Sequence, residues 1–73
     1  MNKYLTISMD DDDFDTIRCE GVFDCYSEAY DRMKESFLDT SEFGSGYIDG
    51  SEAYRVSPDE TERIDWRVIF CES

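Results

Sequence analysis

Polar and apolar side chains alternate along the first stretch of the chain with the period of two that is typical of a half-buried β-strand. Residues 3–9 separate in this way into two sets, Tyr4, Thr6 and Ser8 on one side and Leu5, Ile7 and Met9 on the other. The second set is wholly apolar. We therefore expect a strand whose core-facing side carries Leu5, Ile7 and Met9.

Four consecutive aspartates, Asp10 to Asp13, follow that strand. Adjacent carboxylates repel one another, and aspartate favours turns over strand ladders. The next segment, residues 14–20, mixes Phe14, Ile17 and Cys19 with polar residues. The sequence therefore predicts an acidic turn that joins two strands in a hairpin.

Apolar residues then recur at helical spacing along one stripe, which consists of Tyr26, Ala29, Tyr30, Met33 and Phe37. We expect a helix that begins at Asp24 or Cys25 and ends near Leu38. Asp24 is the better N-cap, because its carboxylate can accept hydrogen bonds from the amides of the first turn. Glu28 is expected near the positive end of the helix dipole.

Beyond the helix, Gly44 and Gly46 are expected to provide a stop and a flexible connection. Strand chemistry returns from Tyr47 in two segments, residues 51–56 and 64–71, around the turn-forming residues Pro58, Asp59 and Glu60. The expected fold is α+β, in one domain spanning residues 1–73. Its order is β-β-α-β-β, with a four-stranded, mainly antiparallel sheet and one helix packed on one face.

One helix covers only one face of such a sheet, which leaves the other face to solvent or to a partner. The last strand places Ile64, Trp66, Val68 and Phe70 on one side and Asp65, Arg67, Ile69 and Cys71 on the other. We expect Trp66 and Phe70 to point inward. In the alternative interpretation, Trp66 joins Tyr4 and Tyr54 as an anchor for a partner or a second copy.

The net charge of the chain limits the classes of molecule that it is expected to bind. The chain has 19 acidic and 7 basic residues, a formal net charge of -12, and enough apolar residues (40%) and aromatic residues (15%) to fold. Binding to a phosphate backbone relies on lysine and arginine, so direct contact with DNA, RNA or anionic lipid is disfavoured. The start of the chain has no sustained apolar run, so we expect a cytoplasmic protein. Cys19, Cys25 and Cys71 are then expected to be reduced.

The residues that most catalysts need are missing from the sequence. There is no histidine, which removes the commonest general base and the triads built on it, and there is no phosphate-binding loop. Cys19 and Cys25 lack the spacing of a structural zinc site. Asp11, Asp13 and Asp15 match the start of a calcium-binding loop, but Thr16 and Val22 stand where that motif needs glycine and glutamate. We expect neither enzymatic activity nor a cofactor or bound metal.

Carboxylates repeated along a helix or a strand can imitate the charge array of a nucleic-acid backbone, because their separation is about 6–7 Å. Such an array would attract a basic protein surface. The residues expected to contact that partner are Asp10, Asp11, Asp12, Asp13, Asp15, Glu28, Asp31, Glu35, Asp39, Asp59, Glu60 and Glu62. Asp49 and Glu52 add further negative charge around the second hairpin.

Two segments resemble known proteins: residues 23–30, Phe-Asp-Cys-Tyr-Ser-Glu-Ala-Tyr, and residues 64–69, Ile-Asp-Trp-Arg-Val-Ile. They are similar to segments of short acidic proteins, mostly uncharacterised, of Gram-positive gut bacteria and their mobile elements. In size, acidity and lack of catalytic equipment, the chain also resembles phage-encoded inhibitors of bacterial defence, such as anti-CRISPR and antirestriction proteins. That resemblance implies a stoichiometric inhibitor that occupies the nucleic-acid channel of a nuclease, and it assigns no individual residue.

The leading hypothesis from the sequence is an acidic protein-binding inhibitor, a nucleic-acid mimic that blocks the basic site of a bacterial defence nuclease or CRISPR effector. One alternative is a small interaction or homodimer module that uses the open apolar face of the sheet. Its binding should resist salt, since salt screens exposed charges but not apolar contact. A second alternative is a divalent-cation-binding domain centred on the acidic turn at residues 10–15.

Overall fold

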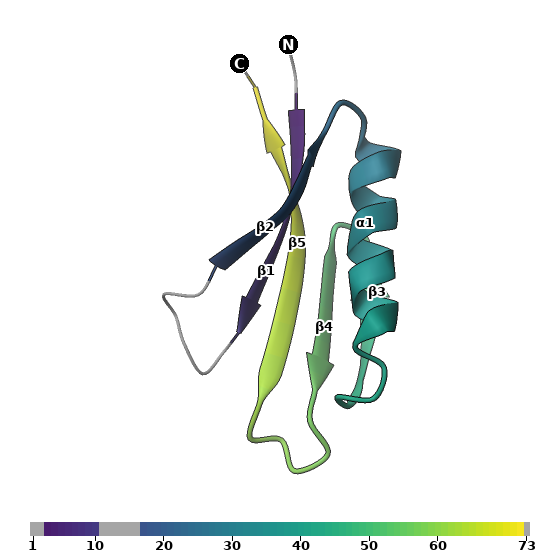
Figure 1. The fold of residues 1–73 in the computed structure, drawn as a ribbon, viewed down its shortest axis with the longest axis vertical. Coiled ribbons are helices and arrows are strands. Elements are labelled where there is room, and N and C mark those ends of the chain that lie inside the picture. The colour runs from purple at the N-terminus through teal and green to yellow at the C-terminus, as the bar shows by residue number, and fades with distance from the viewer. Residues whose placement is uncertain (1–2, 11–16, 73) are drawn as a thin grey trace.

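The computed structural model describes residues 3–10 and 17–72 of the chain. Its elements, in order, are β1 (Lys3–Asp10), β2 (Ile17–Phe23), α1 (Tyr26–Asp39), β3 (Ser45–Asp49), β4 (Glu52–Val56) and β5 (Arg63–Cys71). The strands form one sheet in the order β2-β1-β5-β4-β3, and every neighbouring pair is antiparallel. Figure 1 shows β1 and β5 in the middle of this sheet and α1 along one side of it.

The expected four-stranded sheet is wrong, because the sheet has five strands in this α+β fold. The strand that sequence reasoning missed is β3, whose glycines pointed to a flexible connection. Gly46 in fact lies inside β3, where a Cβ atom would collide with the backbone carbonyl of Tyr54. A two-residue turn then joins β3 to β4, and Gly50 adopts a φ of 61° in it, a conformation that glycine accepts at little cost.

The first hairpin lies three residues later than expected at its second strand, since β2 covers Ile17–Phe23 and not residues 14–20. Its register shifts between Thr6 and Ile7, where Glu20 is an extra residue that has no partner on β1. Asp10 ends β1 and is not part of a turn. The other residues of the predicted acidic turn, 11–13, lie outside the described residues.

Helix α1 begins and ends close to the expected positions, but not for the expected reasons. Cys25 is the N-cap and makes no side-chain cap hydrogen bond, while the carboxylate of Asp24 forms an ion pair with Lys3. Glu28 lies in the first turn as expected. The C-cap is Thr40, well before Gly44, so the glycines do not end the helix. Within the described residues, no helix is both long enough and apolar enough to cross a membrane.

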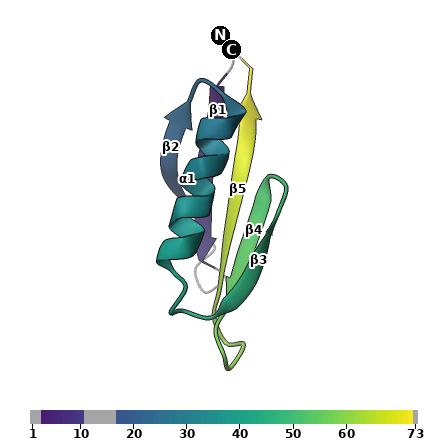
Figure 2. The same cartoon turned by 90° about the vertical axis from the view of Figure 1, so that its right-hand side faces the viewer.

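The core lies between α1 and one face of the sheet. Figure 2 views the molecule from the helix side, with α1 over β1 and β2 and the β3–β4 hairpin beyond β5. The buried apolar residues are Ala29, Met33, Phe37, Ala53, Trp66 and Val68. The prediction that Trp66 points inward is confirmed, since 2% of its surface is exposed. Phe70 belongs to the same face of β5, but it packs against the ring of Tyr4 and is 51% exposed.

The expected core face of β1 is wrong. Thr6 and Ser8 are the buried residues, and the apolar set with Leu5 and Ile7 lies on the face of the sheet away from the helix. The hydroxyl of Thr6 donates a 2.7 Å hydrogen bond to the carbonyl of Ala29, which ties the strand to the helix. The small side chain of Thr6 under Ala29 lets the two backbones approach, so packing and hydrogen bonding override the apolar pattern here.

The proposed aromatic anchor of Trp66, Tyr4 and Tyr54 does not form one surface. Trp66 is in the core, and Tyr4 is half-buried on the helix side, where its ring centroid lies 5.9 Å from that of Tyr26. Tyr54 lies on the opposite face of the sheet, next to Tyr47, with ring centroids 4.8 Å apart. Hydrogen bonding to Tyr47 raises the pKa of the Tyr54 hydroxyl, and the nearby Arg63 opposes that rise.

The turn between β4 and β5 is organised by the carboxylate of Asp59. Asp59 Oδ1 accepts hydrogen bonds from the hydroxyl of Ser57 at 2.7 Å and from the hydroxyl and amide of Thr61 at 2.8 and 3.2 Å. These bonds, that from Ser57 first, lower the pKa of Asp59 below its ordinary value. The turn that the sequence predicted at residues 58–60 is therefore held by the ionised form of Asp59.

We expect the Asp59→Ala variant to have a modestly lower Tm than the parent at neutral pH and a smaller Tm difference from the parent at low pH. A carboxyl whose pKa is lowered by folding stabilises the folded state above the ordinary pKa of aspartate, about 4, and that contribution disappears as the pH falls through the lowered value. Thermal unfolding at pH 7 and pH 3 measures the difference. Glu62→Ala, an exposed change in the same turn, is the control, and a constant Tm gap at both pH values would contradict the assignment.

Candidate functional site

The outward side of α1 carries a line of carboxylates, which we call the acidic stripe: Glu28, Asp31, Glu35 and Asp39. All four are exposed, as the sequence predicted, and they lie opposite the buried side of the helix that carries Ala29, Met33 and Phe37. Residues three or four positions apart are neighbours on one side of a helix. At a rise of 1.5 Å per residue, the stripe extends over about 16 Å.

Few basic groups neutralise the acidic stripe. Arg32 Nη1 lies 3.5 Å from the carboxylate of Glu35, and its Nη2 lies 3.3 Å from Glu20 on β2. Among the described residues, Glu28, Asp31 and Asp39 have no ion pair within 4.0 Å. Most of the negative charge of the stripe therefore faces solvent uncompensated.

The acidic stripe is unfavourable for the helix that carries it. Asp31 and Glu35, and again Glu35 and Asp39, are like charges four positions apart, each pair costing about 0.2–0.5 kcal/mol. Asp39 also occupies the negative end of the helix dipole, and the last turn contains no basic residue. Local stability does not explain this arrangement of charge.

The described contact residues predicted outside α1 lie toward the end of the molecule at which α1 ends. Asp59, Glu60 and Glu62 are exposed in the turn between β4 and β5, which lies at the end toward which α1 runs (Figures 1 and 2). Asp10 is half-buried at the end of β1. The remaining predicted residues, Asp11, Asp12, Asp13 and Asp15, lie outside the described residues, so the structure does not place them.

The face of the sheet away from the helix, which we call the open face, has a different character. Its apolar part over β1, β2 and β5 includes Leu5, Ile7, Met9, Ile17, Val22 and Ile69, and the part over β3 and β4 carries Tyr47, Tyr54 and Val56. Its charged groups are evenly divided into the acids Asp49, Glu52 and Asp65 and the bases Lys3, Arg63 and Arg67. The other described acids lie on the helix side, in connections or after β5, so negative charge is concentrated away from the open face.

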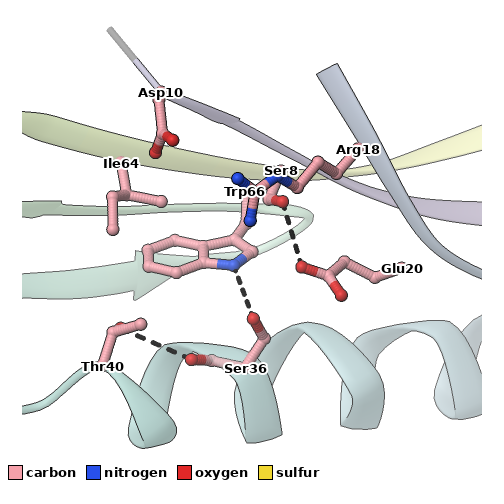
Figure 3. A pocket seen from close by; sticks show the side chains of 8 residues that line it. All are labelled: Ser8, Asp10, Arg18, Glu20, Ser36, Thr40, Ile64 and Trp66. Atoms are coloured by element: carbon pink, nitrogen blue, oxygen red, sulfur yellow. Dashed lines mark hydrogen bonds between the residues drawn. The ribbon is translucent and has the colours of Figure 1, made fainter. Parts of the chain in front are cut away.

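A small cavity of about 200 Å³ opens between the C-terminal half of α1 and the sheet. In Figure 3 the indole of Trp66 extends from the sheet toward the helix, and its Nε1 donates a 2.9 Å hydrogen bond to the hydroxyl of Ser36. The hydroxyl of Ser8, which lies beside Trp66 on the sheet, donates to Glu20 at 3.0 Å. Every buried side-chain nitrogen or oxygen of the described residues has a hydrogen-bond partner. The cavity thus offers no unpaired buried group to a ligand.

Metal and thiol chemistry find little support in the described part of the chain. No group of three or more histidine, cysteine or acidic residues there is arranged to hold a metal ion. Cys19, Cys25 and Cys71 are free thiols. The calcium-loop candidate of the second alternative, with Asp11, Asp13 and Asp15, falls outside the described residues.

Sequence reasoning missed two features of this side of the molecule. The first is the cavity, to which β2 contributes Arg18 and Glu20, because the register shift that turns Glu20 toward the helix has no clear sequence signal. The second is the buried guanidinium of Arg55, which lies under the end of α1. A signal for Arg55 did exist, since it is two residues from Ala53 in a strand and so shares its core-facing side.

Comparisons with known proteins identify no relative. No protein-family model matches this chain, and searches of curated proteins and of solved structures find no match either. A functional interpretation therefore depends on the geometry and charge described above.

Proposed function

We propose that this protein is a non-catalytic, acidic binding protein whose acidic stripe on α1 occupies a basic, nucleic-acid-binding surface of another protein. The observation that carries the proposal is the stripe itself: four exposed carboxylates, three without an ion partner among the described residues, in a line along one helix. A bacterial defence nuclease is the kind of partner that the type resemblance to anti-CRISPR and antirestriction inhibitors favours.

The charge spacing supports mimicry of nucleic acid. Along one strand of duplex DNA there is one phosphate per 3.4 Å of helix axis, and the stripe presents one carboxylate per about 5 Å. A surface lined with lysine and arginine for phosphates can therefore pair with several carboxylates of the stripe at once. Charge concentrated on one side also orients the encounter and speeds association at low salt.

The cost of the stripe to its own helix also supports a role in binding. Groups that violate local stability rules, with compensation elsewhere in the fold, are typical of functional positions. Asp39 illustrates this, because a lysine there would suit both the helix dipole and the neighbouring Glu35. Selection for solubility alone would favour acids at positions where they do not destabilise the helix.

We expect the double variant Asp31→Lys/Asp39→Lys to bind its partner at least about tenfold more weakly, with unchanged or slightly higher Tm. Both lysines remove like-charge pairs with Glu35, and the lysine at position 39 also complements the negative end of the helix dipole, so folding is preserved while the charge array is broken. The measurement is retention of tagged protein and variants on proteins of a bacterial lysate at low salt, with elution by high salt and by competing DNA.

The matched control is Asp49→Lys/Glu72→Lys, which changes the net charge by the same amount away from the stripe. Both of its sites are exposed and make no ion pair among the described residues. An equal loss of binding by both double variants would mean that only the net charge matters, and it would contradict a specific role of the acidic stripe. Capture of no nucleic-acid-binding protein by the parent chain would contradict mimicry itself.

A further inference from the structure

The apolar part of the open face is continuous across three strands. On β1, Leu5 lies between Val22 of β2 and Ile69 of β5. Met9, four residues further along the same strand, is opposite Ile17. Ile17, Val22 and Ile69 expose 60%, 56% and 37% of their surface. Contiguous apolar surface of this kind marks a place where another molecule binds.

The charges of the open face favour a particular occupant. Arg63 lies 3.0 Å from Asp65 and Arg67 lies 3.4 Å from Glu52, so four of its six charged groups pair within the face. The surface around the helix, in contrast, has an excess of carboxylates. A second copy of a chain with a net charge of -12 can approach without strong repulsion only where that excess is absent.

We propose that two copies of this chain pack through their open faces, sheet against sheet, to form a symmetric homodimer. Each chain measures 23 Å along the axis on which α1 stacks against the sheet (Figures 1 and 2), so the two acidic stripes lie on opposite outer sides of the dimer, several Debye lengths apart. The Debye length at physiological salt is about 8 Å, so the stripes barely repel each other across the dimer. This inference does not depend on the proposed function of the stripe.

The size of the open face indicates the strength of the contact. The five strands contain 34 residues, which at about 3.3 Å per residue and about 4.8 Å between strands present a projected area of about 540 Å². A standard interface buries about 800 Å² of accessible surface per partner, so the dimer is near the lower limit for stable association. We therefore expect a dissociation constant in the micromolar range. Salt should strengthen association, because it screens the remaining repulsion and leaves apolar contact intact.

The sheet edges are poorer routes to association. At one edge, β2 contains the bulge at Glu20, which interrupts a regular hydrogen-bonding ladder. At the other edge, β3 has only five residues. Short or bulged edge strands oppose pairing with another chain, whereas the open face has no such protection.

The test compares two variants that place a lysine at equally exposed apolar positions. Val22 on the open face and Leu38 on α1 are each 56% exposed, so Val22→Lys and Leu38→Lys are matched in exposure and in charge. A symmetric interface contains each substitution twice, so we expect Val22→Lys to weaken dimerisation at least about tenfold and Leu38→Lys to leave it unchanged. Sedimentation equilibrium at low and high salt measures both, and circular dichroism confirms folding.

Three outcomes would overturn the dimer: a monomeric parent chain at every concentration and salt tested, equal weakening by both lysine variants, or a different macromolecule on the open face. Failure of this proposal is distinguishable from failure of the stripe proposal. Asp31→Lys/Asp39→Lys should still dimerise, because its changes lie on the outer side. Val22→Lys should still be retained by a basic partner, because its stripe is intact.

Discussion

Replacing Trp66 with alanine is expected to lower the free energy of unfolding by about 3–5 kcal/mol. Trp66 is the largest fully buried side chain, and it packs edge-on against Phe37 with ring centroids 5.7 Å apart. The core of the described chain is small, with six buried apolar residues and five partly buried ones packed against them, so a cavity at Trp66 has few neighbours that can relax into it. A domain of 73 residues typically has about 4–11 kcal/mol of stability, and this change removes a large share.

Urea unfolding followed by far-UV circular dichroism measures this effect, since the variant has lost the only tryptophan. Trp66→Phe keeps most of the ring volume and removes the hydrogen bond from Nε1 to Ser36, so we expect an intermediate loss. Ser36→Ala removes the acceptor alone and should cost about 1 kcal/mol. A loss below about 1.5 kcal/mol for Trp66→Ala would mean that the tryptophan is not the centre of the core.

The spacing of apolar residues along the chain was sufficient to predict the elements that depend on local pattern. The apolar spacing of Ala29, Met33 and Phe37 predicted both the helix and its buried side, and the same periodicity predicted the exposure of the acidic stripe. Alternation in β5 also predicted that Trp66 points inward. In each case the apolar residues that define the pattern are those that pack between helix and sheet.

Tertiary contacts decided the features that the sequence did not predict. Leu5 and Ile7 lie on the open face because the helix approaches β1 over Thr6, whose hydroxyl bonds to the helix backbone. Because the sheet has apolar groups on both faces, alternation alone does not determine which side of β1 faces the helix. The more apolar side of β1 in fact faces away from it. That apolar residues remain outside the core is what makes the open face a candidate interface.

A turn signal was present for the missed fifth strand. Gly50 and Ser51 form a Gly-Ser pair that suits a two-residue hairpin turn, and the residues on either side of the turn, Asp49 and Glu52, pair as β3 and β4. In the sequence, the nearby Gly44 and Gly46 instead indicated a flexible connection. Glycine in a strand can indicate close backbone approach as well as flexibility, and here Gly46 lies against the Tyr54 carbonyl.

The buried charge of Arg55 shows how the end of α1 is stabilised. Arg55 is 6% exposed, and its guanidinium donates to the carbonyls of Gly44 at 2.6 Å and Phe37 at 2.7 Å and to the hydroxyl of Thr40 at 3.2 Å. It also stacks 3.9 Å from the centre of the Phe37 ring. A positive charge from β4 thus complements the negative end of a helix that has no basic residue in its own last turn.

We expect Arg55→Met to lower the free energy of unfolding by about 2–4 kcal/mol. Methionine fills part of the space but leaves the Gly44 carbonyl without its donor and removes charge-assisted bonds worth about 1.5–3 kcal/mol each, partly offset because no charge needs to be buried. Arg55→Lys should lose about half as much, because an ammonium cannot span three acceptors in different directions.

Urea unfolding of these variants at low and high salt supplies the measurement, and Arg67→Met is the matched control. Arg67 makes an exposed ion pair with Glu52, so its replacement should cost less than about 1 kcal/mol and should depend on salt. The loss at Arg55 should be nearly independent of salt, because its acceptors are enclosed between α1 and β4. If Arg55→Met and Arg67→Met were equally stable, the end of the helix would not depend on the buried guanidinium, and the acidic stripe would have to be tolerated without it.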